Sequence, residues 1–454
     1  MNCTEKSILL FLLLSPPLAV MAGEGSNFVG SNSEYSFKVL DHAENTNTKQ
    51  LYQLTALRDG VLESKLTLGG QITALINYQR ANEADKFGWL MRHPTSNNQV
   101  AKSASEAVIH SANLNMTARL DEDFTAYIEM LYNPEQNFAS HSSITGLPRN
   151  NVNVRRAYIL WGNLEERSIY ASIGKMDIPF GLNDTVSPFT NSTNWHSFSG
   201  LAYGAQLGYA KENMHFRLMA IQGGAQFRNA NTSVSGTNVP SKLNNFAMDA
   251  NVDINIVEDG VANIGTSYQR GSGYCQNYVP EGDPPVIGNP ITSPFGVQHF
   301  NACDDNNDAV SVYSAFTGGD LKIIAEYAQT LHPWPGTHNP SIPEFEASKN
   351  TTFTFGGSYS SDVGLANKVT FSAEFSRFEA GASGAPWEKQ DQWVLGASYY
   401  VAPNINLFAE VIRVDGWVPL NFLSGGNPGG KVGESWASQS SHTHIGALGI
   451  QAAF

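Results

Sequence analysis

The chain has 454 residues, a formal net charge of −14, 15% charged residues and 11% aromatic residues. An acidic chain without a Lys/Arg run argues against nucleic acid as a partner. The mean hydropathy of −0.24 and the lack of a long apolar stretch beyond the N-terminus exclude a helical membrane protein, but they suit strands in which only alternate residues face lipid.

Residues 1–22 have the pattern of a secretory signal peptide. A short polar start precedes the Leu-rich stretch Ile8–Val20, and small residues before Gly23 suit cleavage. The apolar run is too short for a lone transmembrane helix, and Pro16-Pro17 would break one. We therefore expect an exported chain whose mature form starts near Gly23.

Residues 23–64 precede the first predicted strand and are expected to form a periplasmic extension. Leucines at positions 51, 54 and 57, followed by Val61, recur at helix-like spacing and predict a short amphipathic helix ending near Asp59-Gly60. The segment is too short for a globular plug domain. A partly disordered extension is the alternative.

From residue 65 to residue 454, sixteen segments have strand-like patterns, and short and long connections alternate between them. The predicted strands are 65–80, 107–120, 124–133, 152–162, 168–177, 200–210, 214–222, 244–256, 261–270, 308–316, 321–330, 351–361, 368–378, 391–401, 405–414 and 442–454. The last one alternates apolar side chains and closes on Phe454. This pattern predicts an all-β, transmembrane antiparallel β-barrel in the outer membrane of a Gram-negative bacterium, with short periplasmic turns and long extracellular loops. A soluble β-sandwich is the rival fold.

Parity along these strands predicts which side chains face the lumen. Four strands carry Glu at the same ordinal position on the inward side, and further charged residues share that parity. The candidates are Glu129, Glu326, Glu374, Glu410, Asp249, Asp253, Arg217 and Lys322. Arg155 and Arg156 are adjacent, so parity sends only one of them inward. A water-filled lumen with such charges suggests an electrostatic selectivity filter. The alternative is that these groups only solvate the wall and pair with one another.

The third long loop begins at Asp177-Ile178-Pro179-Phe180-Gly181 and runs to Trp195-His196. Its Pro-Phe-Gly turn resembles the start of the loop that folds into the barrel and forms the constriction of sixteen-stranded porins. That resemblance implies that Asn183, Asp184, Trp195 and His196 lie near the narrowest point. An ordinary surface loop is the alternative.

Two cysteines remain after processing, Cys275 and Cys303, in one polar, proline-rich segment. In an oxidising compartment they predict a single disulfide that closes this loop. Their spacing does not suit a metal site, and the pairs His442/His444 and His332/His338 are interpreted as incidental. We predict no metal and no cofactor.

Several architectural stretches also resemble a known family. They are Leu51–Leu54, Gly60–Leu62, Leu66–Gly70, Val154–Tyr158 and Gly174–Gly181. Together they resemble the legiobactin-type siderophore porins, sixteen-stranded outer-membrane proteins of intracellular bacteria such as Legionella. The resemblance extends over roughly residues 50–454 and implies siderophore-bound iron as cargo. Its motifs are architectural and assign no ligand residues.

The sequence therefore predicts an outer-membrane porin or uptake channel for small solutes, with a ferric siderophore as the cargo implied by the resemblance and no plug domain of its own. A general or cation-preferring nutrient porin and a surface adhesin barrel are the alternatives. Ser, His and Asp are plentiful, but no motif singles out a catalytic set, so we do not expect an enzyme. The expected partners are outer-membrane lipid and a small solute, and either a monomer or a homotrimer is compatible with the sequence.

Overall fold

The structure is a computed structural model that describes residues 28–84, 86–89, 101–132, 152–222, 226–227, 232–233, 243–274, 277–279, 299–301, 307–339, 341–418, 433–435 and 437–454. The expected signal peptide and both cysteines of the predicted disulfide, Cys275 and Cys303, lie outside the described residues. Within the described part of the chain, no helix is long and apolar enough to cross a membrane.

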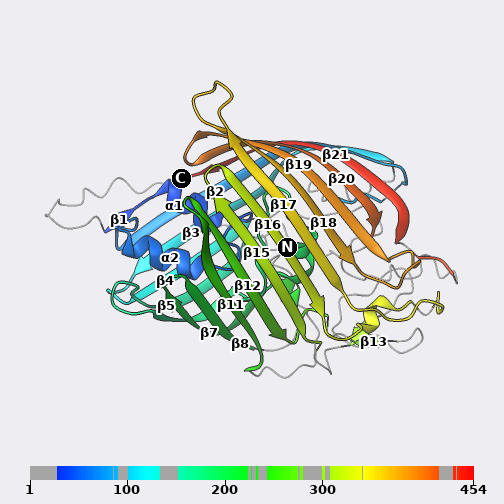
Figure 1. The fold of residues 1–454 in the computed structure, drawn as a ribbon, viewed down its shortest axis with the longest axis horizontal. Helices are drawn as coiled ribbons and strands as arrows, with labels where there is room; N and C mark the ends of the chain where they lie inside the picture. Colours follow the sequence, from blue (N-terminus) through cyan, green and yellow to red (C-terminus); the bar gives the residue numbers. More distant parts are fainter. Residues whose placement is uncertain are drawn as a thin grey trace, which may run out of the picture.

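Antiparallel strands joined in chain order form a closed barrel (Figure 1). The main sheet has seventeen strands, of which β1 is a short parallel addition, so sixteen form the wall. The wall strands are β2 Leu66–Ala81, β3 Ser103–Arg119, β4 Phe124–Tyr132, β5 Val152–Trp161, β6 Ile169–Asp177, β7 Leu201–Lys211, β8 Met214–Gln222, β11 Leu243–Val257, β12 Gly260–Arg270, β15 Ala309–Gly318, β16 Leu321–Thr330, β17 Thr351–Ser361, β18 Val369–Glu379, β19 Lys389–Ala402, β20 Ile405–Trp417 and β21 Ser438–Ala453. Pairing of β2 with both β3 and β21 closes the ring.

The predicted fold class is confirmed, and every predicted strand has its counterpart in the wall. The largest differences are at strand starts: β3 begins at Ser103 rather than 107, and β21 at Ser438 rather than 442. Outside the wall, two short hairpins pair β9 Gln226–Phe227 with β10 Thr232–Ser233, and β13 Asn277–Val279 with β14 His299–Asn301. A 3-10 turn, η2, covers Pro335–Thr337.

Side chains alternate between the two faces of the wall, as β20 illustrates. Asn406 and Glu410 are buried on the inner side, whereas Leu407 and Val411 between and beyond them are exposed on the outer side. The outer face carries exposed large apolar side chains on nearly every strand. A closed ring with an apolar exterior leaves no unpaired strand edge in lipid, so the chain is a β-barrel of the bacterial outer membrane.

Residues 28–65, here called the N-terminal segment, fold back into the barrel at the end where the short turns lie (Figure 1). The segment contains β1 Val29–Gly30, α1 Ser33–Leu40 and α2 Lys49–Arg58. Asn32 caps α1, because its side chain accepts a hydrogen bond from the Tyr35 amide at 2.9 Å. The Tyr35 hydroxyl then reaches Thr117 on the inner wall, also at 2.9 Å.

The face that α2 buries is mixed, because Leu54 and Ala56 are as deeply buried as its polar residues. Lys49, Gln50 and Gln53 are almost fully buried, whereas Leu57 is only partly buried and Val61 is 39% exposed. The Tyr158 hydroxyl on the wall donates to Gln53 Oε1 at 2.8 Å. The predicted helix therefore exists, but only Leu54 of its apolar stripe is almost fully buried, and polar side chains share the docked face because the inner wall of this barrel presents polar groups.

Candidate constriction site

The loop between β6 and β7, residues 178–199, folds into the barrel and is here called the inner loop. It includes the short helix α3 Thr193–Phe198, which packs against β16, β17 and β18. Gly181 makes the first turn with a φ of +70°, a left-handed conformation that favours glycine. A Cβ atom there would lie 2.2 Å from the Glu326 carboxylate, so the turn needs glycine for space as well.

Three glutamates on alternate wall strands hold the inner loop. Glu326 on β16 accepts the amides of Leu182 at 2.9 Å and Asn183 at 2.8 Å. Glu374 on β18 accepts the Val186 amide at 2.9 Å. These bonds satisfy backbone N–H groups that would otherwise be buried without partners.

The third glutamate, Glu410 on β20, accepts three hydrogen bonds. The amides of Phe189 and Thr190 donate at 2.8 and 3.0 Å, and the Thr190 hydroxyl donates as well. Charged acceptors make hydrogen bonds roughly twice as strong as neutral ones. The loop is therefore fixed along its length to the wall.

The three glutamates do face inward, as parity predicted, but they do not line open water. Glu326, Glu374 and Glu410 are 4%, 3% and 2% exposed because the inner loop covers them. In this conformation their carboxylates bind loop amides, so a filtering role for them stays a prediction.

Arg155 and Arg156 both point into the barrel, which corrects the prediction that only one does. A β-bulge lies between β4 and β5, where Glu129 pairs with Arg156 and Met130 pairs with Val154. The extra residue, Arg155, breaks the alternation and turns its side chain to the same side. Both arginines are buried, at 8% and 1% exposure.

These arginines belong to a buried charge cluster. Arg156 contacts Glu129 at 2.7 Å and makes a two-point contact with Asp177, at 2.6 and 2.7 Å. Arg155 approaches Glu129 only at 3.6 Å. The bidentate geometry orients Asp177, the residue at which β6 ends and the inner loop begins.

The other predicted lumen charges also have partners. Arg217 pairs with Asp249 at 2.7 Å, and Asp253 accepts a hydrogen bond from Asn263 at 2.7 Å. Lys322 pairs at 2.7 Å with Glu44, a residue of the N-terminal segment. The wall therefore contacts the segment directly, which the sequence did not suggest.

The linker between α1 and α2, residues 41–48, lies against the inner loop. The Ala43 carbonyl accepts the Thr185 amide at 2.9 Å, while Asp184 accepts the amides of Asn45 at 3.2 Å and Thr46 at 3.1 Å. One backbone–backbone hydrogen bond and two hydrogen bonds from backbone amides to the Asp184 carboxylate thus join the two stretches.

Two side chains of the linker extend this contact at either end. The Asn47 amide donates to the carbonyls of Phe180 at 2.7 Å and Gly181 at 2.9 Å. The His42 imidazole lies 2.8 Å from the Phe189 carbonyl, and Arg217 on the wall donates to the Asn47 carbonyl. The linker and the inner loop together cross the interior of the barrel.

Burial in this contact shifts the ionisation of groups at its centre. Burial raises the pKa of Asp184 and that of Asp41 to about 6 each. Burial lowers the pKa of His42 to about 4 and that of Lys49 to about 8. Lys49 is held by the carbonyls of Val39 and Asp41 at 2.8 and 2.7 Å.

The remaining predicted loop residues take up structural positions. Pro179 and Phe180 are buried, and Phe180 stacks on Phe198 with ring centroids 5.8 Å apart. Trp195 and His196 are half-buried on α3, in edge-to-face contact at 5.0 Å. Among the described residues, no group of three or more His, Cys, Asp or Glu side chains is arranged to hold a metal ion.

The sequence interpretation missed the linker residues His42, Asn45, Thr46 and Asn47 as part of this site. The one available signal was compositional: the stretch Glu44–Thr48 is wholly polar yet lies directly before a helix. A polar stretch of this kind is normally interpreted as a solvent-exposed loop. Its burial could be expected only if the polar interior of the barrel were known to bind it.

Comparisons with known proteins concern the fold alone. Neither the protein-family models nor the curated proteins gave a match to this chain. Among solved structures, an anion-selective porin from Comamonas acidovorans is 12% identical with a TM-score of 0.49, covering 86% of this chain and 99% of its own. The outer-membrane channel DcaP of Acinetobacter baumannii is 13% identical with a TM-score of 0.49, covering 86% and 97%. OmpF of Salmonella typhi in complex with daunomycin is 14% identical with a TM-score of 0.47, covering 86% and 97%. A likeness at this level says nothing about cargo.

Proposed function

We propose that this chain is an outer-membrane channel for small solutes and that its own N-terminal segment closes it. The observation that carries the proposal is the pairing of linker residues 41–48 with the inner loop across the barrel interior. A sixteen-stranded barrel is wide enough for an aqueous path. Here two segments of the same chain occupy that path, so transport requires one of them to move.

The N-terminal segment is the part suited to moving. The inner loop is held by buried, charge-assisted bonds to Glu326, Glu374 and Glu410 on the wall. The linker is held by neutral hydrogen bonds, each contributing about 1 kcal/mol net, together with charged contacts to Asp184, Arg217 and the half-exposed Glu44–Lys322 pair. Docking also buries Leu54 and Ala56 of α2 in an apolar cluster with the wall, so movement of the linker alone costs less than release of the whole segment.

The test is a reversible cross-link between the linker and the inner loop. Ala43 and Thr185 are bonded through their backbones, so the pair A43C/T185C places two thiols near each other. The background carries C275S and C303S. We expect single-channel openings in planar bilayers under reducing conditions and loss of these openings after oxidation.

A43C alone is the matched control and should conduct equally in both conditions. Equal conductance of the oxidised and reduced double variant would contradict gating by the segment.

Reversal potentials in a KCl gradient then report whether cations or anions pass. Chemical cross-linking of the refolded barrel distinguishes a monomer from a homotrimer, and the gating proposal holds for either.

The ferric siderophore implied by the family resemblance is the finer proposal for the cargo. It predicts that an added ferric siderophore blocks the current in a concentration-dependent way. The acidic groups near the path, such as Asp184 and Asp253, oppose an anionic ferric polycarboxylate. A neutral or cationic complex is therefore the version of this cargo that the wall favours.

A closed receptor or adhesin is the second candidate function, and the occluded interior favours it. A folded, heat-modifiable barrel that never conducts, cross-linked or not, would support this reading and remove the channel proposal. No catalytic role is proposed for the chain.

A further inference from the structure

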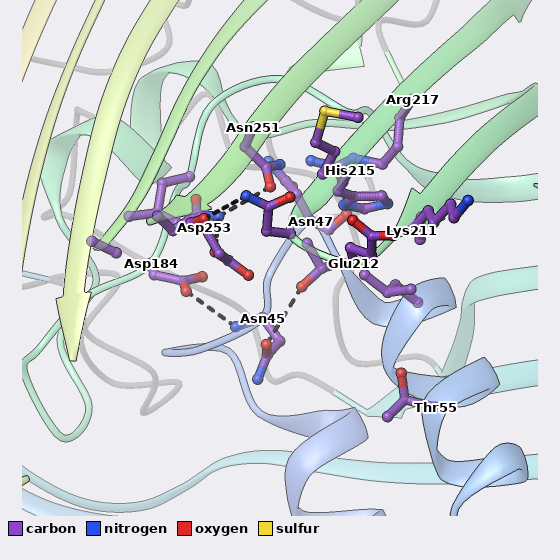
Figure 2. Close-up of a pocket in the computed structure, with 18 of the residues that line it drawn as sticks. Asn45, Asn47, Thr55, Asp184, Lys211, Glu212, His215, Arg217, Asn251 and Asp253 are labelled. Atoms are coloured by element: carbon purple, nitrogen blue, oxygen red, sulfur yellow. Dashed lines mark hydrogen bonds between the residues drawn. The ribbon is translucent and has the colours of Figure 1, made fainter. Parts of the chain in front are cut away.

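A cavity of about 510 Å³ lies beside the constriction, on the periplasmic side of the inner loop. One side of it is the N-terminal segment, from Asn45 through Thr55 to Arg58. The other side is the wall, including β8, β11, β12 and β15, and Figure 2 shows side chains from both parts facing the same space. The volume falls within the range of small-molecule sites.

Charged side chains of both signs line the cavity. Figure 2 shows Asp184 and Asp253 on one side, with Lys211 and Glu212 together on the other. Lys211 and Glu212 are adjacent opposite charges on an exposed turn. Arg217 also lines the cavity, but Asp249 neutralises it at 2.7 Å. Arg58, the third basic residue of the lining, pairs with Asp59 at 2.8 Å, which leaves the negative charges of Asp184 and Asp253 uncompensated within the lining.

Four of the five asparagines that line the cavity, all but Asn45, donate side-chain N–H groups to other protein atoms. Asn47 Nδ2 donates to Phe180 and Gly181 carbonyls, and Asn213 Nδ2 donates to the Asp253 carbonyl at 3.0 Å. Within the described part of the chain, the Asn47 Oδ1 atom receives no hydrogen bond, although Asn47 is only 3% exposed.

Two further asparagines repeat this pattern on the wall. Asn263 Nδ2 donates to Asn251 at 3.0 Å and to Asp253 at 2.7 Å. Asn251 Nδ2 donates to Asp249 at 3.1 Å and to the Tyr313 hydroxyl at 3.2 Å. Most of these amide donors are used, so among the described residues the cavity offers a ligand the oxygens of Asp184, Asp253 and Asn47, beside the unpaired Nε of Arg217.

We propose that this cavity binds small organic cations bearing N–H donors, namely ammonium or guanidinium groups, and this rests on the channel function proposed above. Such a cation satisfies carboxylate and amide oxygens together through charge-assisted hydrogen bonds. An anionic solute meets the carboxylates of Asp184 and Asp253. The proposal therefore assigns small organic cations as the substrate class of the channel.

Binding at this site also acts on the closed state. Asp184 accepts the amides of Asn45 and Thr46, which belong to the linker. A cation that pairs with Asp184 competes with these two amides for the same oxygens. The bound cation therefore weakens the contact between the linker and the inner loop, so cargo of this class promotes opening.

The test uses the full-length refolded protein and isothermal titration calorimetry with 1,4-diaminobutane. Tetramethylammonium is the first control, because it is a cation without N–H donors, and citrate is the second. We expect saturable binding of the diamine only. D253N should weaken diamine binding about tenfold or more, the usual effect of losing a hydrogen bond to a charged group.

D259N is the matched control variant, since Asp259 lies in the exposed turn between β11 and β12 and does not line the cavity. Equal binding of tetramethylammonium, or unchanged diamine binding in D253N that is still heat-modifiable, would overturn the site. Calorimetry measures binding whether or not the channel conducts, so the binding proposal and the channel proposal are tested independently. Conduction without diamine binding rejects the site alone, and binding without conduction rejects the channel alone.

Discussion

Glu410 shows what a single buried carboxylate does in this barrel. It accepts two backbone amides and one hydroxyl from the inner loop, and E410A would leave those donors buried without partners. We expect the free energy of unfolding to fall by roughly 2–4 kcal/mol. Urea titration of the refolded barrel followed by tryptophan fluorescence measures this. E379A, at the exposed end of β18, is the control and should change stability little.

Arg155 and Arg156 are neighbours, but we expect them to contribute differently to the free energy of unfolding. R156Q removes the partner of both Glu129 and Asp177 and leaves buried charge uncompensated, which typically costs about 3–5 kcal/mol. Arg155 stands 3.6 Å from Glu129 and makes no bidentate contact with it, so R155Q should cost far less. The same urea titration compares the two variants. Equal losses would mean that the bulge itself, rather than the ion pairs, supplies the stability.

Parity explains both the success and the failure of prediction at the level of single residues. The inward direction of Glu326, Glu374 and Glu410 follows from strict alternation, which an unbroken ladder guarantees. The shared direction of Arg155 and Arg156 requires a bulge, and no residue type in that stretch announces one. What the glutamates bind was also out of reach, because it depends on a loop from elsewhere in the chain.

At the level of elements, the linker and the inner loop form one contact whose strength depends on pH. Asp184 and Asp41 have a pKa of about 6 when the segment is docked, against about 4 in water, so falling pH favours the docked state through them. His42 has a pKa of about 4 when docked, against about 6.5 in water, so falling pH favours release through it.

The carboxyl groups and His42 respond to pH in opposite directions. The sign of the change in conductance with pH should therefore depend on which of them is replaced. Each pKa unit corresponds to about 1.4 kcal/mol, so the wild-type terms largely cancel between pH 7 and pH 5. H42Q should conduct less as pH falls over this range, because only the carboxyl groups then respond. D184N combined with D41N should conduct more. Open probability in planar bilayers is the measurement, and parallel pH profiles in both variants would refute the assignment.

The helix α2 shows why elements inside a barrel resist sequence-based reading. The usual rule assigns the apolar stripe to the buried face, but of this stripe only Leu54 is almost fully buried, whereas Leu57 and Val61 are not. The structure also buries Lys49, Gln50 and Gln53, because the surface that receives the helix is the polar inside of a membrane protein. The existence of the helix followed from its spacing. Its orientation required knowledge of the receiving wall.

For the whole molecule, docking of the N-terminal segment predicts a difference in reactivity between two lysines of that segment. Lys38 on α1 is exposed, whereas Lys49 is 2% exposed and bonded to two carbonyls. Acetylation of the folded barrel should modify Lys38 at least tenfold faster than Lys49. Peptide mass spectrometry measures both rates in one sample. Similar rates would show that the segment spends most of its time outside the barrel.

The sixteen-stranded barrel as a whole could be predicted because each wall strand repeats the same two-residue alternation and turn chemistry. The contact inside the barrel could not. It joins two segments, residues 41–48 and 178–199, that are distant in sequence and meet only after the wall has brought them together. The inner loop carried one sequence signal, its Pro-Phe-Gly turn, and the linker carried no comparable motif.

The three glutamates that hold the inner loop sit on β16, β18 and β20 and meet it near residues 182, 186 and 190. The loop is thereby attached to the wall at regular intervals, and its position is inherited from the barrel. The linker is attached chiefly to the loop. In the proposed gating, the inner loop is the fixed part of the constriction and the linker is the part that moves. Substitutions in the linker should therefore alter how often the channel opens. Substitutions in the inner loop or in its three glutamates should alter the shape of the open channel, so the two properties can be engineered separately.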